Sequence, residues 1–313
     1  MTDVAAVCAS ELEHEAFVYS SDDEYVSTLA PLIEAAVNAG DEVIVVVPTA
    51  NERLLRAALT VAAHRVSWID AAEWYRHPAR TISAYDRALR ELRPGCAAFV
   101  IGEVQFGTTE TEWAEWTRYE SVLNRVLERY PARVICPYDA RALAPAVVAD
   151  ASRTHPTLVG IDARRPSVAF VEPEVFVTPL PPARSNGDVF EATIVGARSV
   201  RDGRRLFTEV ARDVGFADER VDELAVAVSE VLTNAVVHGG GRATMRVSAE
   251  RHEVLCVVAD EGAGADDPLL GFRAPNGMSE GGYGLWFARQ TFDRVEIERS
   301  AAGGLVVHLV AVC

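Results

Sequence analysis

Residues 221–238 read VDELAVAVSEVLTNAVVH, and the spacing of the apolar side chains in this stretch decides the fold of the C-terminal half. Apolar residues recur at intervals of three and four, which predicts a helix with one buried face. Beside that stripe, Glu230, Asn234 and His238 recur at every fourth position. A carboxylate, an amide and an imidazole are therefore expected along one edge of a packed helix. The apolar positions are Val221, Leu224, Ala225, Val228, Leu232 and Ala235.

Two glycine clusters follow this helix. Asp260, Gly262 and Gly264 form a D-x-G-x-G run just after the apolar run 254–258. Glycine lets the backbone turn sharply and approach a ligand closely, and bare amides at a helix N-terminus favour phosphate. The helix and the clusters together predict a nucleotide-binding site. The second cluster opens another helical stretch and consists of Gly281, Gly282, Gly284 and Leu285.

Three polar residues have chemistry that suits such a site. Glu230 is a candidate general base. Asn234 offers a neutral oxygen, which can coordinate Mg²⁺. Asp260 can accept a hydrogen bond from an exocyclic amine such as that of adenine. The remaining candidate cofactor contacts are His238, Gly262, Gly264, Arg273, Gly282, Gly284 and Leu285.

Each of these features also has a plainer interpretation. A stripe of polar residues is often only the solvated edge of a helix. Gly262 and Gly264 could form a hairpin turn, and 239–241 could simply end the preceding helix. Their occurrence together and in this order favours a nucleotide site. The long loop 265–281 between the clusters then reads as a mobile lid.

The composition excludes several classes of protein. All 30 basic residues are arginine, so the chain lacks the lysine that a P-loop or a typical protein kinase requires. Phosphate contacts must then come from backbone amides, arginine or a metal ion. The formal net charge of −16 argues against direct binding to nucleic acid, because a phosphate backbone requires a basic surface.

The chain shows no targeting or membrane signal and no cysteine motif. No apolar run is long enough to span a bilayer and no signal peptide is evident, so a cytoplasmic location is expected. The five cysteines are scattered without CxxC spacing, which predicts neither a disulfide framework nor a zinc site. They are Cys8, Cys96, Cys136, Cys256 and Cys313.

The first half alternates short apolar runs with helical stretches, which predicts an α/β domain over residues 1–178 with a mostly parallel sheet and helices on both faces. The strand-like runs are 16–19, 43–47, 66–69, 96–101 and 134–136, and the helical stretches are 24–38, 51–62, 81–92, 112–128 and 142–152.

A proline-rich linker, 179–187, separates a second domain over 188–313. In this domain, strands that follow one another through tight turns favour an antiparallel or mixed sheet with helices on one face, an α+β two-layer sandwich. The expected strands are 190–195, 243–249, 254–258, 294–298 and 305–310, and the expected helices are 199–214, 217–238 and 283–291.

Three motifs in the second domain resemble those of the GHKL (Bergerat-fold) ATPases, and among them the anti-sigma-factor serine kinases most closely. They are SEVLTNAVVH at 229–238, DEGAG at 260–264 and GGYGL at 281–285. The resemblance implies a site for ATP and Mg²⁺ in which Glu230 activates a serine hydroxyl, Asn234 holds Mg²⁺ and Asp260 reads adenine. The implied partners are a STAS-type anti-sigma-factor antagonist, which is the phosphate acceptor, and a sigma factor. Kinases of this resemblance are often homodimers.

Two alternatives to the kinase stay open: a partner switch that binds ATP without transferring phosphate, and an ATPase that works as a clamp. Two departures from the family bear on them. Where the family often carries glycine followed by threonine, this chain has Gly303, Gly304 and Leu305, so no threonine hydroxyl is offered there. The stretch 199–214 contains no histidine, which argues against autophosphorylation on histidine.

The ends of the strand-like runs in the first domain carry polar residues, and ligands of open parallel sheets bind at such ends. A sensory pocket is therefore predicted, although tyrosine and aspartate at strand ends also cap helices and a histidine before proline can begin a turn. Its candidate residues are His14, Tyr19, Glu103, Tyr138, Asp139 and His155.

This half resembles the MEDS sensory domain, a module similar to the RecA/KaiC-like core. The matching segments are 14–47, CPYDAR at 136–141 and THP at 154–156. The resemblance implies that the domain senses a small molecule. Residues 20–23 supply SSDD in place of a phosphate-binding loop, which argues against ATP binding in this half.

Overall fold

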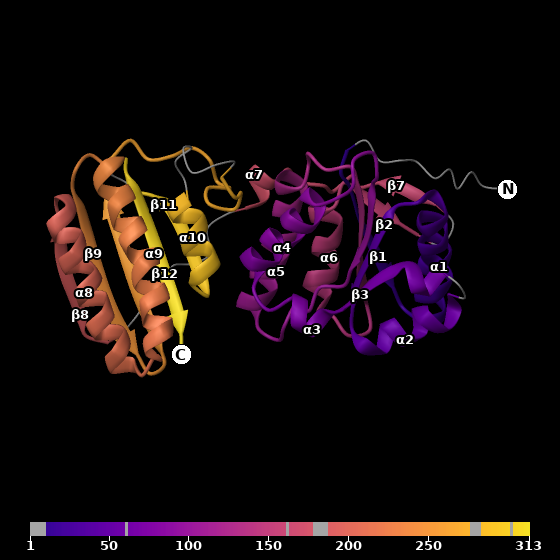
Figure 1. The fold of residues 1–313 in the computed structure, drawn as a ribbon, viewed down its shortest axis with the longest axis horizontal. Helices are drawn as coiled ribbons and strands as arrows, with labels where there is room; N and C mark the ends of the chain where they lie inside the picture. The colour runs from indigo at the N-terminus through magenta and orange to yellow at the C-terminus, as the bar shows by residue number, and fades with distance from the viewer. Residues whose placement is uncertain (1–10, 60–61, 161–162, 178–186, 276–282, 301–302) are drawn as a thin grey trace. The chain divides into compact units, whose positions relative to one another are not determined.

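The computed structural model describes residues 11–313 except 60–61, 161–162, 178–186, 276–282 and 301–302. The chain folds into two compact units, residues 1–177 and 178–313 (Figure 1). The expected linker, 179–187, falls almost entirely outside the described residues. Among the described helices, none combines the length and the hydropathy that crossing a membrane requires.

The N-terminal unit is built on a seven-stranded sheet with the order β3-β2-β4-β5-β1-β6-β7. Its neighbouring strands run parallel except β7, which is antiparallel to β6, so the expected, mostly parallel sheet is confirmed. The sequence pattern does not predict strands β6 and β7, because each is only three residues long. The strands are β1 (Glu13–Tyr19), β2 (Glu42–Val47), β3 (Val66–Asp70), β4 (Ala98–Gly102), β5 (Ala132–Asp139), β6 (Thr157–Val159) and β7 (Arg164–Pro166).

Local capping explains where the longer helices of this unit begin and end. At the start of α1, Ser21 Oγ accepts a hydrogen bond from the Glu24 amide, and Gly40 ends the helix with a φ of 87°. At the start of α5, Thr109 and Glu112 form a reciprocal capping box. The helices are α1 (Asp22–Ala39), α2 (Thr49–Ala58), α3 (Ala71–Trp74), α4 (Pro78–Arg90), α5 (Glu110–Val126), α6 (Pro145–Thr154) and α7 (Pro173–Phe176), with a 3₁₀ turn η1 (Ala62–Arg65).

Helices cover both faces of this sheet, with α1 and α2 on one side and α4, α5 and α6 on the other (Figure 1). Side chains alternate along β1 accordingly. Phe17 and Tyr19 belong to one core with Tyr25 and Leu29 of α1. His14 instead contacts residues of α5 and of the end of α6. Neighbouring residues of one strand therefore belong to different sites.

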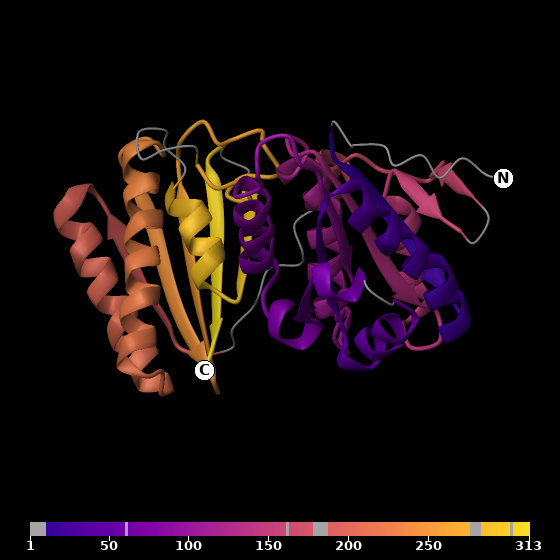
Figure 2. The same cartoon turned by 45° about the vertical axis from the view of Figure 1, so that its right-hand side comes forward.

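The C-terminal unit is built on a five-stranded sheet with the order β11-β12-β10-β9-β8. All of its described strand pairs are antiparallel, and its described helices lie on one face of the sheet (Figure 2), which confirms the expected architecture. The elements are β8 (Val189–Ile194), α8 (Gly196–Val214), α9 (Asp218–Val237), β9 (Ala243–Glu250), β10 (Glu253–Asp260), α10 (Tyr283–Thr291), β11 (Arg294–Arg299) and β12 (Leu305–Val312).

The core of this unit lies between the sheet and the buried faces of the three helices. Phe207 of α8 is fully buried and meets Phe292 edge to face, at 6.0 Å between ring centroids. Gly203 lets α8 lie close to α9 and to the sheet, because a Cβ there would be 3.0 Å from Ile194 Cδ1 and 3.0 Å from Leu232 Cδ1. This packing places α9 across β10, whose last residue is Asp260.

Replacing Phe207 by alanine should destabilise the C-terminal unit by about 3–5 kcal/mol, since it leaves a cavity between helices and sheet. Urea unfolding followed by far-UV circular dichroism measures this loss. Phe190→Ala is the matched control, because Phe190 of β8 is 48% exposed and should cost about 0.5 kcal/mol or less. Equal losses for the two variants would contradict the described core.

Candidate functional site

The polar edge of α9 lies where the sequence pattern predicts it. Glu230 and Asn234 are half-buried on the helix, and His238 caps its C-terminal end, exposed to solvent. The backbone amide of His238 donates to the carbonyl of Asn234 at 2.8 Å, so the helical geometry reaches His238. The three side chains therefore follow one another along the edge of a single packed helix.

A cavity of about 220 Å³ opens beside this edge. Its polar residues are Asn234 and His238 of α9 and Asp260 of β10, and the rest of its wall is apolar or glycine. A mainly apolar cavity with a few convergent polar groups is the usual form of a site for a small heteroaromatic ligand. The other lining residues are Val231, Ala235, Val258, Gly264, Ala265, Leu270, Leu285, Leu305 and Val307.

The carboxylate of Asp260 is held in place by the backbone around it. Its Oδ1 accepts hydrogen bonds from the amide of Gly262 at 2.9 Å and from the amide of Leu305 at 3.2 Å. No hydrogen bond to Oδ2 is formed by the residues that the structure describes. One oxygen thus fixes the orientation of the carboxylate, and the other is available to a donor in the cavity.

Glycines make this close approach feasible. A Cβ on Gly239 would lie 2.4 Å from Asp260 Cβ, and a Cβ on Gly304 would lie 2.1 Å from the Asp260 carbonyl oxygen. On Gly262 a Cβ would lie 2.7 Å from the Cα of Gly239. The sequence analysis does not predict the contacts of Gly239 and Gly304 with Asp260. From the sequence, Gly239 only ends a helix, and Gly304 only belongs to a segment that departs from the family. Gly240 and Gly241 do end the helix with positive φ, as that plainer interpretation expects.

The start of α10 packs directly against the polar edge of α9. A Cβ on Gly284 would lie 2.6 Å from Asn234 Nδ2 and 3.1 Å from Glu230 Cβ. Glu230 itself is not among the residues that line the cavity, but it sits one helical turn from Asn234. Gly282 lies outside the described residues, so its predicted contact with phosphate stays a prediction.

The described part of the expected lid, residues 265–275, is packed onto α10. The Nε of buried Arg289 donates to the Leu270 carbonyl at 3.0 Å, and its guanidinium lies 3.9 Å from the centre of the Phe272 ring. Leu270 contributes to the cavity wall. Arg273, predicted as a cofactor contact, is exposed and is not one of the described residues that line the cavity.

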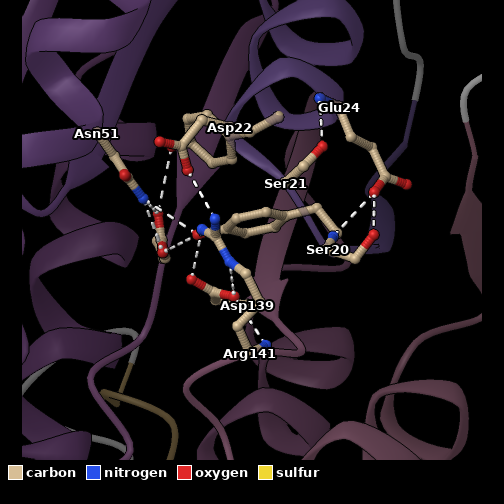
Figure 3. A network of polar contacts seen from close by, with 10 residues as sticks. Ser20, Ser21, Asp22, Glu24, Asn51, Asp139 and Arg141 are labelled. Carbon is tan, nitrogen blue, oxygen red and sulfur yellow. Dashed lines mark hydrogen bonds and ion pairs between the residues drawn. The ribbon is translucent and has the colours of Figure 1, made fainter.

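In the N-terminal unit, two of the six predicted pocket residues form a buried hydrogen-bond cluster. The hydroxyl of Tyr19 donates to Glu103 Oε1 at 2.9 Å, and the hydroxyl of Tyr25 donates to Oε2 at 3.2 Å. Asn51 donates to both carboxylate oxygens, and Figure 3 shows it within one polar network. Burial raises the pKa of Glu103 despite these three donors.

Asp139 lies at the edge of the same network (Figure 3). Arg141 donates to both of its oxygens at 2.9 Å and also pairs with Asp22 of α1 at 2.9 Å. These bonds with Arg141 lower the pKa of Asp139. The guanidinium of Arg141 lies 5.6 Å from the centre of the Tyr19 ring. Asp139 is therefore engaged in joining the end of β5 to the start of α1.

The other three predicted residues lie on the opposite face of the sheet. The rings of His14 and His155 are 4.1 Å apart, and those of Tyr138 and His155 are 5.8 Å apart. Tyr138 and Asp139 are consecutive in β5, so their side chains point to opposite faces. The six residues thus form two separate clusters, and the expectation that they line a single pocket is wrong.

Comparison with known proteins matches each unit to a family. The model of the MEDS domain (MEthanogen/methylotroph, DcmR Sensory domain) matches residues 13–156, and that of the histidine kinase-like ATPase domain matches residues 196–310. The serine-protein kinase RsbW of Bacillus subtilis (strain 168) is 29% identical over 30% of this chain and 68% of its own length. The anti-sigma F factor of Bacillus licheniformis is 31% identical over 32% of this chain and 77% of its own length.

A solved structure, that of the RsbU and RsbW domains of Rv1364c from Mycobacterium tuberculosis, is 19% identical with a TM-score of 0.31. The match covers 41% of this chain and 33% of that one, so this chain spans about a third of its length.

The family match and the antiparallel sheet with helices on one face identify a histidine kinase-like ATPase domain, here preceded by a MEDS domain. Through this C-terminal unit, the chain belongs to the family of the anti-sigma F factors and the RsbW serine-protein kinases.

Replacing Gly284 by alanine should weaken the binding of ATP with Mg²⁺ by about tenfold or more, which corresponds to about 1.4 kcal/mol. The new methyl group displaces the Asn234 amide, while that flexible amide can move without unfolding the domain. Isothermal titration calorimetry measures the affinity. Gly160→Ala is the control, because a Cβ there makes only an ordinary contact at 3.5 Å. Unchanged affinity in folded Gly284→Ala would refute the assignment of Asn234.

Proposed function

We propose that the C-terminal unit is a serine protein kinase that uses ATP with Mg²⁺ to phosphorylate a STAS-type anti-sigma-factor antagonist, and that it also binds a sigma factor. The observation that carries the proposal is the convergence of Asn234, His238 and Asp260 on one mainly apolar cavity. The relatives named as serine-protein kinase and as anti-sigma F factor support the choice of acceptor and partner.

In this proposal the cavity receives the adenine ring. The apolar wall, which includes Val258 and Leu285, excludes water from its faces. The oriented carboxylate of Asp260 accepts a hydrogen bond from the exocyclic amine through its second oxygen. This arrangement selects adenine over guanine, whose corresponding group is a carbonyl and would face the carboxylate without a donor.

The phosphates then extend from the cavity toward Asn234 and the start of α10. Asn234 supplies a neutral oxygen of the kind that Mg²⁺ accepts, and the backbone amides at a helix N-terminus favour phosphate oxygens. Bound Mg²⁺ would neutralise charge on the phosphates during transfer. The close contact of Gly284 with Glu230 and Asn234 keeps these groups beside one another.

Glu230 is the proposed general base. Its carboxylate takes the proton of the acceptor serine as the serine oxygen bonds to the γ-phosphorus, and the bond from phosphorus to the bridging oxygen breaks to release ADP. Glu230 is not among the described residues that line the cavity, which supports a role toward the protein substrate rather than toward adenine. Phosphorylation adds negative charge to the surface of the antagonist and weakens its docking.

We further propose that the MEDS unit senses a small molecule and modulates the kinase unit, and that its sheet is related to the RecA/KaiC core. The family match and the sheet order support this assignment. A ligand can regulate the kinase only if it binds one arrangement of the chain more tightly than another.

The kinase proposal predicts that Glu230→Gln lowers phosphoryl transfer by about 10²–10⁴-fold, because it removes the proton acceptor and leaves the adenine contacts in place. Radiolabelled ATP, the full chain and a purified STAS protein from the same host provide the assay, with phosphoserine mapping as the readout. Glu223→Gln is the matched control, since Glu223 lies exposed on the same helix.

Two results would contradict the kinase activity, and a third would contradict the role of Glu230. Nucleotide-dependent binding of the STAS protein without any labelled serine would establish the non-catalytic partner switch instead. Release of phosphate without an acceptor would establish an ATPase clamp. Transfer at the normal rate by Glu230→Gln would leave phosphorylation intact but remove Glu230 from the mechanism.

A further inference from the structure

A group of four metal-binding side chains lies buried in the N-terminal unit, and the proposed kinase chemistry does not use it. His14 of β1 and Cys136 of β5 meet Glu120 of α5 and His155 at the end of α6. Their exposed fractions are 2%, 3%, 0% and 0%, respectively. One nitrogen, oxygen or sulfur atom of each lies within 4.8 Å of those of the other three.

Four of the six distances within this group match the edges of a tetrahedron of ligands, and the other two are no longer than 4.8 Å. Glu120 Oε2 lies 3.3 Å from His14 Nε2, 3.4 Å from Cys136 Sγ and 3.5 Å from His155 Nε2. His14 Nε2 lies 3.3 Å from Cys136 Sγ. Tetrahedral zinc, with bonds of about 2.0–2.1 Å to nitrogen or oxygen and about 2.3 Å to sulfur, separates its ligand atoms by roughly 3.3–3.6 Å.

The surroundings of His14 orient its ring toward the group. The Nδ2 of Asn124 donates to the Thr154 carbonyl at 2.7 Å, so the Oδ1 of Asn124 is an acceptor. His14 Nδ1, which lies 3.1 Å from that oxygen, must then carry the hydrogen. In the neutral ring, Nε2 consequently presents a lone pair to Glu120 and Cys136. Histidines that bind metals are typically held by such a bond through the other ring nitrogen.

His155 is held in the same way. Its Nδ1 lies 3.0 Å from the Ala151 carbonyl, which can only accept, so Nδ1 carries the hydrogen. Its Nε2 faces Glu120 with no hydrogen-bond partner among the described residues, and Glu120 Oε1 likewise has none. Unpartnered polar atoms at full burial are costly unless something else satisfies them.

We propose that His14, Glu120, Cys136 and His155 bind one divalent transition-metal ion of the zinc type as a four-coordinate site. A doubly charged cation, one thiolate and one carboxylate sum to zero charge, which suits a buried location. The mixture of imidazole, thiolate and carboxylate fits zinc better than Mg²⁺ or Ca²⁺. On binding, Cys136 gives up its thiol proton to solvent.

A metal ion bound at this site would link four elements of the MEDS unit, namely β1, β5, α5 and the end of α6. Four protein ligands leave no open position for substrate, which is the arrangement of a structural rather than a catalytic zinc site. The ion would connect the adjacent strands β1 and β5 with helices α5 and α6, and its ligands range from residue 14 to residue 155 of the sequence. Its existence does not depend on the kinase proposal.

The first test measures the metal content of the full chain, purified without chelators or a metal-affinity tag. Inductively coupled plasma mass spectrometry should find a stoichiometric transition metal, chiefly zinc. After removal of the metal and addition of Co²⁺, the absorption spectrum should show a thiolate-to-cobalt charge-transfer band and the visible bands of tetrahedral cobalt. A folded chain that contains no metal and shows no such band overturns the proposal.

Variants identify the ligands. Cys136→Ser should abolish the charge-transfer band, whereas Cys256→Ser, which replaces an equally buried cysteine of the other unit, should retain it. Asn124→Ala, which removes the hydrogen bond that supports His14 but none of the four proposed ligands, should weaken metal binding by roughly 10–100-fold without eliminating the band. Circular dichroism checks that each variant folds. A charge-transfer band that persists in folded Cys136→Ser contradicts the assigned ligand set. If Cys136→Ser fails to fold, Asn124→Ala still tests the proposal, because an unchanged metal affinity in that variant contradicts the same ligand set.

Discussion

Close backbone packing in the C-terminal unit surrounds a single carboxylate, that of Asp260. Gly239, Gly262 and Gly304 come from three separate segments, and none has room for a Cβ beside Asp260 or its neighbours. That packing lets two backbone amides orient the carboxylate at the end of β10, next to an apolar cavity. The polar edge of α9 borders this arrangement, because Asn234 and His238 line the same cavity as Asp260.

Much of this unit could be predicted from the sequence, because its signals are local. The helical period in 221–238 predicts both the helix and its buried face, and the glycines that follow Asp260 predict the turn after the strand. Each of these signals lies within a few residues of the feature that it predicts. The expected helix 283–291 coincides with α10. The contacts of Gly239 and Gly304 with Asp260 could not be predicted, since they depend on how three distant segments approach one another.

The N-terminal unit shows the limit of the same reasoning. The alternating pattern predicted the parallel sheet, but residues at neighbouring strand ends were assigned to one pocket although they point to opposite faces. Glu120 and Cys136 were missed as members of a buried cluster. Metal motifs are recognised by short spacings such as CxxC, whereas this cluster draws one residue from each of four elements between residues 14 and 155.

One arginine couples helix α10 of the C-terminal unit to the wall of the cavity. Arg289 of α10 holds the carbonyl of Leu270 through Nε and the carbonyl of Val295 through Nη1, while its guanidinium stacks on Phe272. Leu270 forms part of the cavity wall. Any displacement of α10 would therefore also move Leu270, and with it one part of the cavity wall.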